Sequence, residues 1–268
     1  MSKAGRTQGP KVLFFDIEIA PIRAYVWGLF DQNVGLNQIE TDWHVLSWSA
    51  KWLGDSEILY ADQRGAKNVE DDKYLLKGIW HLLDEADIVV TQNGKKFDVK
   101  KLNARFIING FQPPSSFKHI DTLQLAKKHF GFTSNKLEYL SNTLNAKFKK
   151  LVGNREYEGF KLWTECLAGN LKAWKEMERY NKYDVLALEE LYNRMIPWDS
   201  TVNFSLYREG NEHVCTCGSS RLQKRGYEFT STGKYQRYQC QECGKWSRGA
   251  VNLFTSDKRQ SLTRNVKG

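Results

Sequence analysis

The feature that most constrains this chain is a short apolar run near its N-terminus that contains two acidic residues. Residues 11–20 read KVLFFDIEIA, and their β-branched and aromatic side chains predict a buried β-strand. Asp16 and Glu18 are two positions apart, so both side chains leave the same face of that strand. Two buried carboxylates are unfavourable unless a cation neutralises them, and Mg²⁺ prefers such oxygen ligands. A solvent-facing pair at a strand end is the alternative.

Further strands and helices are predicted along the first two thirds of the chain. The expected strands are 45–52, 57–61 and 87–92, and the expected helices are 70–86, 97–109, 121–130, 135–146 and 170–195. Strands come first, then alternate with helices, which favours an α/β domain with a mixed sheet flanked by helices. Four aromatic residues between the first strand and this alternating region are expected mostly in the core: Trp27, Phe30, Trp43 and Trp48.

Two further acidic motifs lie at the start of one predicted helix and inside another. Asn93 to Asp98 reads NGKKFD and places Asp98 in the first turn of a helix, where an acid is ordinarily stabilising. Tyr180 and Asp184 are four residues apart in the long C-terminal helix, so they share a face. Taken alone, each motif is better explained without a catalytic role, Asp98 by helix-start chemistry and Asp184 as a surface acid beside a core tyrosine.

The last quarter of the chain carries most of the net charge. Residues 204–268 hold 12 Lys and Arg against 5 Asp and Glu, which leaves 28 against 26 for residues 1–203 of the total of 40 and 31. The overall net charge of +9 favours a polyanionic partner. Four of the five cysteines lie in the same quarter, and without an export signal such a cluster indicates metal rather than disulfides.

The cysteine spacing predicts one structural zinc site. Cys240-Gln-Glu-Cys243-Gly244 has the form of a zinc knuckle, and a tetrahedral Zn²⁺ ion needs four ligands. Cys215 and Cys217 complete the simplest set, although His213 could replace Cys215. Between the two pairs, alternating segments and a turn at Thr232-Gly233 predict a small β-hairpin.

Basic residues alternate with aromatic residues in this cysteine-rich segment. That mixture suits phosphate contacts and base stacking, although the rings could equally fill a minimal core while the charges solvate it. Lysines beside the second acidic motif could also meet phosphates or could form a solvated helix face. The candidate substrate-binding residues are Asn93, Lys95, Arg221, Lys224, Arg225 and Arg237.

Taken together, the three acidic motifs resemble those of the DEDD 3′–5′ exonucleases of the RNase H-like superfamily, in the subgroup with a tyrosine in the third motif (DEDDy). Segments 117–130 and 136–144 are similar to virus- and bacterium-encoded proteins of this group. The resemblance spans about residues 11–195 and implies an RNase H-like fold. Residues 217–246 resemble the zinc ribbons of transposase-type and other DNA-handling proteins.

The resemblance implies a two-metal phosphodiester hydrolase. Two Mg²⁺ or Mn²⁺ ions would be held by Asp16, Glu18, Asp98 and Asp184, and Tyr180 would orient the attacking water. The implied reaction releases nucleoside 5′-monophosphates from single-stranded 3′ ends of DNA, and the zinc ribbon aids DNA binding. An exoribonuclease or a structure-specific DNA endonuclease would use the same acids. A nucleic-acid-binding adaptor is the non-enzyme alternative, and the intact set of acids argues against it.

Three segments are expected along the chain: a nuclease domain over 1–203, a zinc ribbon over 204–249 and a basic flexible tail over 250–268. The polar N-terminus and the lack of an apolar run of about 18 residues favour a cytoplasmic protein without membrane contact. A virus-encoded protein would act in the host cytoplasm. DNA is favoured over RNA as the partner, and a replication or recombination protein is a candidate second partner.

Overall fold

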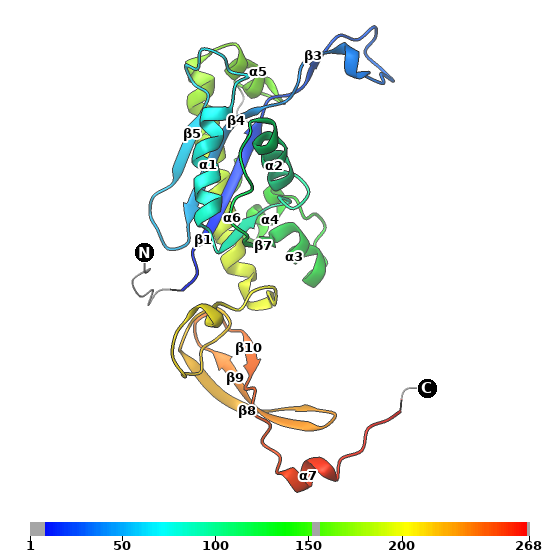
Figure 1. Cartoon of the computed structure of the whole chain (residues 1–268), viewed down its shortest axis with the longest axis vertical. Coiled ribbons are helices and arrows are strands. Elements are labelled where there is room, and N and C mark those ends of the chain that lie inside the picture. The colour runs from blue at the N-terminus through cyan, green and yellow to red at the C-terminus, as the bar shows by residue number, and fades with distance from the viewer. Residues whose placement is uncertain (1–8, 152–155, 267–268) are drawn as a thin grey trace. The chain divides into compact units, whose positions relative to one another are not determined.

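The computed structural model describes residues 9–151 and 156–266, and it divides into two compact units (Figure 1). The first unit comprises Lys11–Arg194, and the second comprises the chain from Met195 onward together with the described residues up to Pro10. The predicted domain boundary at residue 203 lies a little further along the chain. Residues 1–8, whose polar character supported the expected localisation, lie outside the described residues. No helix in the described part of the chain is long and apolar enough to cross a bilayer.

The first unit is built on a five-stranded mixed sheet with the order β5-β4-β1-β6-β7. Its strands are β1 (Val12–Ile19), β4 (Val45–Trp52), β5 (Leu59–Asp62), β6 (Ile88–Thr91) and β7 (Lys118–Asp121). β1 pairs antiparallel with β4 and parallel with β6, so it lies where the two halves of the sheet meet. The helices are α1 (Lys73–Glu85), α2 (Asp98–Ile108), α3 (Thr122–His129), α4 (Leu137–Leu144), α5 (Lys161–Leu167) and α6 (Leu171–Met195). The predicted mixed α/β fold is confirmed.

Every strand and helix predicted in the first unit is present, with ends shifted by a few residues. β7 and α5 were not predicted, because each is too short for a hydrophobic period to emerge. The pairing of β6 with β7 is parallel, which extends the β1–β6 half of the sheet. The sequence therefore predicted four of the five strands and missed β7 at one edge of the sheet.

Alternation along β1 supplies two separate cores. Leu13, Phe15 and Ile17 belong to the cluster that packs under α1 and α2. Phe14 points to the other face, where its ring centroid lies 5.8 Å from that of Tyr192 on α6. The two faces of the sheet are thus covered by different helices (Figure 1). The even-numbered side chains of β1 face α6.

Helix α1 lies close to β4 at Gly78. A Cβ atom at this position would come within 2.6 Å of Cζ2 of Trp48. The indole Nε1 of Trp48 also donates a hydrogen bond to the carbonyl of Leu75 at 2.9 Å. Glycine in a helix interior is unfavourable by about 1 kcal/mol relative to alanine, and the close approach of this ring explains its presence.

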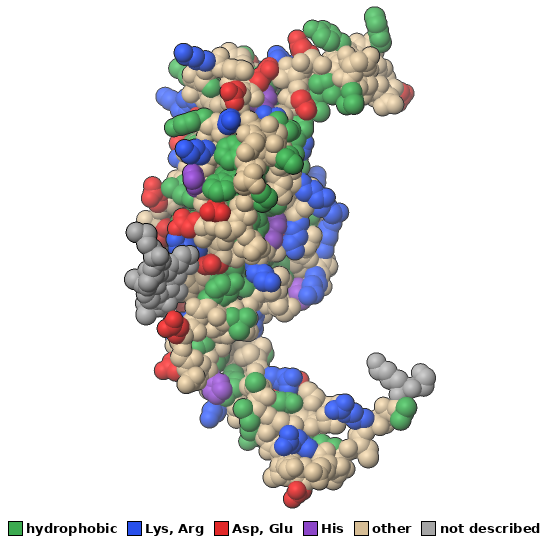
Figure 2. All heavy atoms as spheres, in the orientation of Figure 1, with side chains coloured by type: hydrophobic (Ala, Val, Ile, Leu, Met, Phe, Trp, Pro, Cys, Tyr) green, Lys and Arg blue, Asp and Glu red, His purple; other side chains and the backbone are tan. Residues whose placement is uncertain are grey.

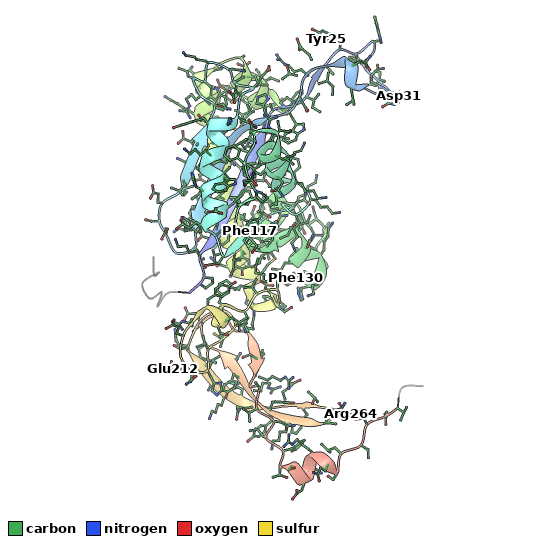
Figure 3. All side chains as sticks on the ribbon, viewed as in Figure 1. Tyr25, Asp31, Phe117, Phe130, Glu212 and Arg264 are labelled. Atoms are coloured by element: carbon green, nitrogen blue, oxygen red, sulfur yellow. The ribbon has the colours of Figure 1, made fainter. Side chains whose placement is uncertain are left out.

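An apolar arm extends from the first unit between β1 and β4. Its short strands β2 (Arg23–Ala24) and β3 (Ile39–Thr41) pair only with each other, and Figure 3 labels Tyr25 and Asp31 on it. Trp27 is 100% exposed and Phe30 is 83% exposed, and Figure 2 shows hydrophobic side chains gathered on the arm. The expectation that these two rings are in the core is wrong, because β2 and β3 form a separate two-stranded sheet that leaves both rings exposed. Of the other two aromatic residues, Trp48 is buried and Trp43 is half-buried.

The second unit contains a three-stranded antiparallel sheet with the order β10-β9-β8. Its strands are β8 (Leu222–Thr230), β9 (Gly233–Cys240) and β10 (Trp246–Arg248). The predicted β-hairpin is confirmed, with its turn at residues 231–232. The segment expected as a flexible tail includes a short helix, α7 (Ser256–Gln260), whose N-terminus is capped by the hydroxyl of Thr255.

A buried carboxylate holds the start of α1 against its neighbours. Asp72 is fully buried and accepts hydrogen bonds from the Val45 amide at 2.9 Å and from Nε and Nη2 of Arg105, both at 2.8 Å. Asn109 adds a further bond at 3.1 Å. These contacts connect β4, α1 and α2. Loss of the carboxylate would leave a largely buried guanidinium without its counter-charge, which is strongly unfavourable.

We expect Asp72→Ala to lower the free energy of unfolding by about 3–5 kcal/mol, measured by urea denaturation of the full chain. Asp71→Ala is the matched control, because the exposed Asp71 side chain accepts the Lys73 amide at 3.2 Å and the variant keeps the backbone carbonyl that accepts from Gln63. The control should lose less than about 1 kcal/mol. Equal losses in the two variants would show that the Asp72 network does not stabilise the fold.

Candidate functional site

The first candidate site lies between the centre of the sheet and α6. Asp16, Glu18 and Asp184 each offer a carboxylate oxygen, and these oxygens lie within 4.8 Å of one another. The fold explains why they meet. Asp16 and Glu18 follow Phe14 on the α6 face of β1, while Asp184 precedes Tyr192 by about two helical turns on the same side of α6. The first and third predicted motifs are therefore brought together.

The acid of the second motif lies beside this cluster. Asp98 begins α2, directly after β6 and its loop, and is buried. The backbone N–H groups of Ile17 and of Asp98 itself donate toward its carboxylate, which places it next to β1. Asp98 is not within the 4.8 Å group, but its charge is among the causes that raise the pKa of Asp16. Three acids thus form a tight cluster with a fourth adjoining it.

The loop before α2 has a backbone that only particular residues can adopt. Asn93 has a φ of 67°, and a Cβ atom at Gly94 would come within 2.2 Å of Oγ1 of Thr91. Asp121 accepts hydrogen bonds from the amides of Asn93 at 2.9 Å and Lys95 at 3.2 Å, and it also caps α3. Asp121 therefore shapes the loop that carries the second motif.

Burial gives the cluster unusual proton affinities. Burial first, and then the charges of Asp98, Glu18 and Asp184, raise the pKa of Asp16 well above its ordinary value. Burial and the charge of Asp184 raise the pKa of Glu18 to about 8, and burial raises that of Asp98 to about 7. Burial also raises the pKa of Asp184. The acids cannot all be charged at neutral pH unless cations offset their repulsion.

The cluster already attracts one cation. Lys150 forms an ion pair with Oδ2 of Asp184, and its Nζ lies 4.7 Å from the ring centroid of Tyr180. Burial opposes the charge on Lys150, but Asp184, Tyr180 and Asp16 outweigh burial and raise its pKa. Oδ1 of Asp184 is buried without a hydrogen-bond partner among the described residues. An unsatisfied buried carboxylate oxygen in a negative cluster fits a divalent metal ligand.

Two side chains that were not predicted orient the acids of β1. Asn181 is fully buried, donates to Oδ2 of Asp16 at 2.7 Å and accepts from Oγ of Ser47 at 3.2 Å. Nε1 of Trp163 donates to Oε2 of Glu18 at 3.0 Å. Asn181 lies on the buried side of α6, and a polar residue on the buried side of a predicted helix could have been recognised in the sequence as a candidate site residue. Nothing comparable in the sequence marked Trp163 or Lys150.

Tyr180 lies at the edge of the same cluster. Its ring makes an edge contact with Trp163, with centroids 6.0 Å apart. Burial and the charge of Asp184 raise its pKa above the ordinary value near 10, so the hydroxyl stays protonated at neutral pH. A protonated hydroxyl can donate or accept a hydrogen bond but cannot act as a base.

Cavities lie beside Lys150 and Trp163, two residues that contact the acids. One has a volume of about 470 Å³, and the residues that line it include Gln92, Asn93, Asn135, Lys136 and Lys150. Another has a volume of about 320 Å³, and its lining includes Ile19, Pro21, Trp43, Lys101, Phe160 and Trp163. The predicted substrate residue Asn93 thus lines a cavity beside Lys150. Nζ of Lys95, the other such residue here, donates to Gln124 at 3.3 Å.

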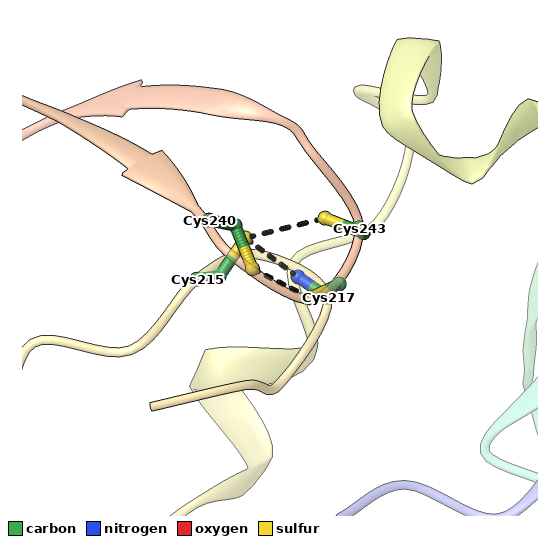
Figure 4. Close-up of side chains that lie close together, drawn as sticks. All are labelled: Cys215, Cys217, Cys240 and Cys243. Carbon is green, nitrogen blue, oxygen red and sulfur yellow. Dashed lines mark hydrogen bonds between the residues drawn. The ribbon is translucent and has the colours of Figure 1, made fainter. Parts of the chain in front are cut away.

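The second candidate site is formed by the four cysteines of the C-terminal unit (Figure 4). The sulfur atoms of Cys215 and Cys243 are 3.8 Å apart, as are those of Cys217 and Cys240, and all four lie within 4.8 Å of one another. Tetrahedral coordination with Zn–S bonds of about 2.3 Å requires sulfur–sulfur separations of about 3.8 Å. The set therefore fits a zinc ion closely.

His213 does not belong to this group of potential metal ligands. It is exposed, and its ring centroid lies 5.1 Å from that of Tyr238. A hydrogen bond from Cys217 is the main cause that lowers the pKa of Cys215 to about 5. The sulfur of Cys215 lies 3.8 Å from that of Cys243 within the four-cysteine group, so the geometry does not support the alternative in which His213 replaces it.

The predicted nucleic-acid-binding residues of this unit fall into different settings. Arg221 forms an ion pair with Glu242 at 3.1 Å. Nε of Arg237 donates to the carbonyl of Arg225 at 3.0 Å, so these two arginines are neighbours. Lys224 lies on the face of the sheet opposite to that of Arg237, because it pairs with Tyr238, the next residue along β9.

Comparisons with known proteins agree with the fold of the first unit. The family B DNA polymerase from the hyperthermophilic archaeon Pyrobaculum calidifontis is similar in structure, with a TM-score of 0.52 and 17% sequence identity over 73% of this chain and 26% of the polymerase. This chain thus spans about a quarter of the polymerase, and the likeness concerns the fold alone. A search of curated proteins finds no match.

The sequence profile of the RNase_H superfamily matches residues 13–196. The match includes β1 with its two acids, the second motif and α6 with Tyr180 and Asp184. It therefore covers the sheet and the whole acidic cluster, and accounts for well over half of the chain. On this evidence the chain belongs to the RNase_H superfamily.

Proposed function

We propose that the chain is a metal-dependent 3′–5′ exonuclease that hydrolyses phosphodiester bonds at single-stranded ends of DNA. The observation that carries the proposal is the acidic cluster of half-buried Asp16 and Glu18 with buried Asp184, in which Asp184 keeps an unsatisfied oxygen and Lys150 supplies a positive charge. A superfamily of nucleases and a fold similar to part of a DNA polymerase support it.

Asp16, Glu18, Asp98 and Asp184 would hold two Mg²⁺ or Mn²⁺ ions. When bound, such ions activate a water molecule and stabilise the leaving oxygen of a phosphodiester. Asn181 and Trp163 hold the carboxylates of Asp16 and Glu18 in fixed orientations through hydrogen bonds of 2.7 and 3.0 Å. Tyr180 positions the attacking water through its protonated hydroxyl.

The C-terminal unit would bind one Zn²⁺ ion through Cys215, Cys217, Cys240 and Cys243 and would help to hold DNA. The ion has a structural role, because all four ligand positions are taken by protein sulfur atoms. The basic surface of the unit supports an interaction with a polyanion. The motif resemblance supports the 3′ to 5′ direction and DNA over RNA, and a replication or recombination protein remains a candidate second partner.

We expect Asp184→Asn to abolish Mg²⁺-dependent cleavage while leaving the fold intact, because the amide cannot supply the charge that a metal requires. The assay follows 5′-labelled single-stranded DNA and RNA of the same sequence on a denaturing gel. The wild-type protein should produce a ladder that shortens from the 3′ end.

Asp84→Asn is the control for this variant, because Asp84 lies on α1 and accepts hydrogen bonds from Ser115. It should cleave at the wild-type rate. Degradation of RNA alone would indicate an exoribonuclease, and internal cuts would indicate an endonuclease on the same acids. Wild-type cleavage by Asp184→Asn would refute the proposed site.

Tyr180→Phe should slow hydrolysis by about 100-fold, because misplacing the attacking group has effects of this size. Metal binding should persist, since the acids are unchanged. The test compares the single-turnover rate with the midpoint of a Mn²⁺ titration. A shifted midpoint with an unchanged rate at saturating Mn²⁺ would show that Tyr180 supports the metal rather than the water.

Glu18→Gln should stabilise the chain at alkaline pH in the absence of added divalent metal. Burial raises the pKa of Glu18 from an ordinary value of 4.5 to about 8, so between these pH values the folded state keeps a proton that the unfolded state has lost. Stability should therefore fall as pH rises through this window, and the variant should escape that loss.

Thermal unfolding should show a higher Tm for Glu18→Gln than for wild type at pH 8 and equal values near pH 4.5. Added Mg²⁺ should raise the Tm of the wild type more than that of the variant. A variant that is no more stable than wild type at pH 8 would contradict the raised pKa.

A further inference from the structure

We propose that one face of the three-stranded sheet in the C-terminal unit binds single-stranded nucleic acid through three arginines and two aromatic rings. We call it the arginine face, and it consists of Arg225, Arg237, Arg248, Tyr235 and Trp246. The inference rests on the proposed nucleic-acid-binding role of this unit and names the surface that performs it.

Strand register places the three arginines in one row. Arg248 of β10 is directly opposite Arg237 of β9. Arg225 falls at the irregularity of β8 between Lys224 and Tyr227, and its carbonyl accepts the hydrogen bond from Nε of Arg237. Adjacent strands are about 4.8 Å apart, so the row crosses the whole sheet over a short distance.

Such a row is unfavourable for the sheet itself. Like charges directly opposite each other on neighbouring strands are destabilising. Among the described residues, none of the three guanidinium groups forms an ion pair with a carboxylate. Glu228 is on the same face, since it pairs with Tyr235, but it leaves a net positive charge. A polyanion laid across the row would relieve the repulsion and gain three charge-assisted contacts.

Aromatic rings lie on both sides of the row. Cζ of Arg248 lies 3.9 Å from the ring centroid of Tyr235, and Cζ of Arg237 lies 4.8 Å from that of Trp246. Trp246 remains 48% exposed despite this contact. An exposed ring beside phosphate-binding cations can stack a base, and bases are free to do so in a single strand rather than inside a duplex.

The opposite face of the sheet has a different character. Tyr238 lies on it opposite Ser247, is buried and packs against His213, while Cys240 on the same face enters the cysteine site. The end of that face near the cysteines therefore contributes to the interior of the unit, whereas its hairpin end exposes Tyr227 by 45% and Phe229 by 63%. The same face also carries Lys234, whose Nζ lies 4.0 Å from the ring centroid of Tyr227.

Lys234 provides a matched control for Arg248. Each is a cation over a tyrosine ring at almost the same distance, and the two lie on opposite faces. Lys234→Ala and Arg248→Ala remove the same charge, so a difference between them reports the face and not the net charge of the chain.

The test uses the full zinc-loaded chain with Asp184→Asn, so that the probe is not degraded. Binding of a fluorescein-labelled 12-nucleotide oligo(dT) is followed by fluorescence anisotropy between 50 and 300 mM salt. Arg248→Ala should weaken binding about 10-fold and flatten the salt dependence by about 0.7 in log–log slope, the value for one phosphate contact on a single strand. Lys234→Ala should stay within about 2-fold of the parent chain.

Trp246→Ala should weaken binding at least about 5-fold, the lower end of the effect of one stacked base, without changing the salt slope. An oligo(U) probe of the same length compares RNA with DNA. If the variants lose equal affinity for oligo(U) and oligo(dT), the face recognises the phosphate backbone and the stacked bases that the two polymers share. A duplex probe that binds as tightly as oligo(dT) would overturn the preference for single strands.

Equal losses in Lys234→Ala and Arg248→Ala, or no loss in Arg248→Ala, would overturn the proposal. Zinc content and circular dichroism show whether each variant is folded, and Arg248→Gln, which also removes the charge, serves if Arg248→Ala is not. Cleavage is measured separately on the chain with Asp184 intact. Its absence there would refute the proposed nuclease and leave the binding comparison standing.

Discussion

The pair of half-buried carboxylates on the central strand is the constraint around which the first unit is organised. β1 is paired on both sides, so the side chains of Asp16 and Glu18 can leave only through the faces of the sheet. They leave toward α6, where hydrogen bonds from Asn181 and Trp163 and the charge of Lys150 partly offset their burial. α5, α6 and the loop that carries Lys150 therefore surround those carboxylates and supply these groups.

The sequence predicts the parts of this arrangement that depend on the periodicity of a single strand or helix. The alternation in β1 predicted that Asp16 and Glu18 share a face, and the four-residue spacing predicted the same for Tyr180 and Asp184. The prediction failed for Trp27 and Phe30, because an aromatic residue is apolar whether or not anything packs on it. Trp163 and Lys150 reach the acids from segments without periodicity, so only the folded chain reveals them.

The two units depend on different sources of stability. The first buries two hydrophobic clusters on opposite faces of its sheet. The second exposes nearly all of β8 and buries few large side chains apart from Phe204 and Tyr238. A unit of that size with so small a core ordinarily needs a metal or disulfides, and the cysteine geometry matches the former. A sheet face that does not pack in a hydrophobic core can then hold the like-charged row of the arginine face.

The order of the strands has a consequence for synthesis. β1 has partners on both sides that are made later, since Leu13 pairs with Trp52 and with Val89. The contact between Asn181 and Asp16 spans 165 positions. Contacts of such sequence separation form late, because the chain must first close a long loop. The two acids of β1 therefore leave the ribosome long before their shell exists, and the nascent chain cannot assemble its acidic cluster until α6 has emerged.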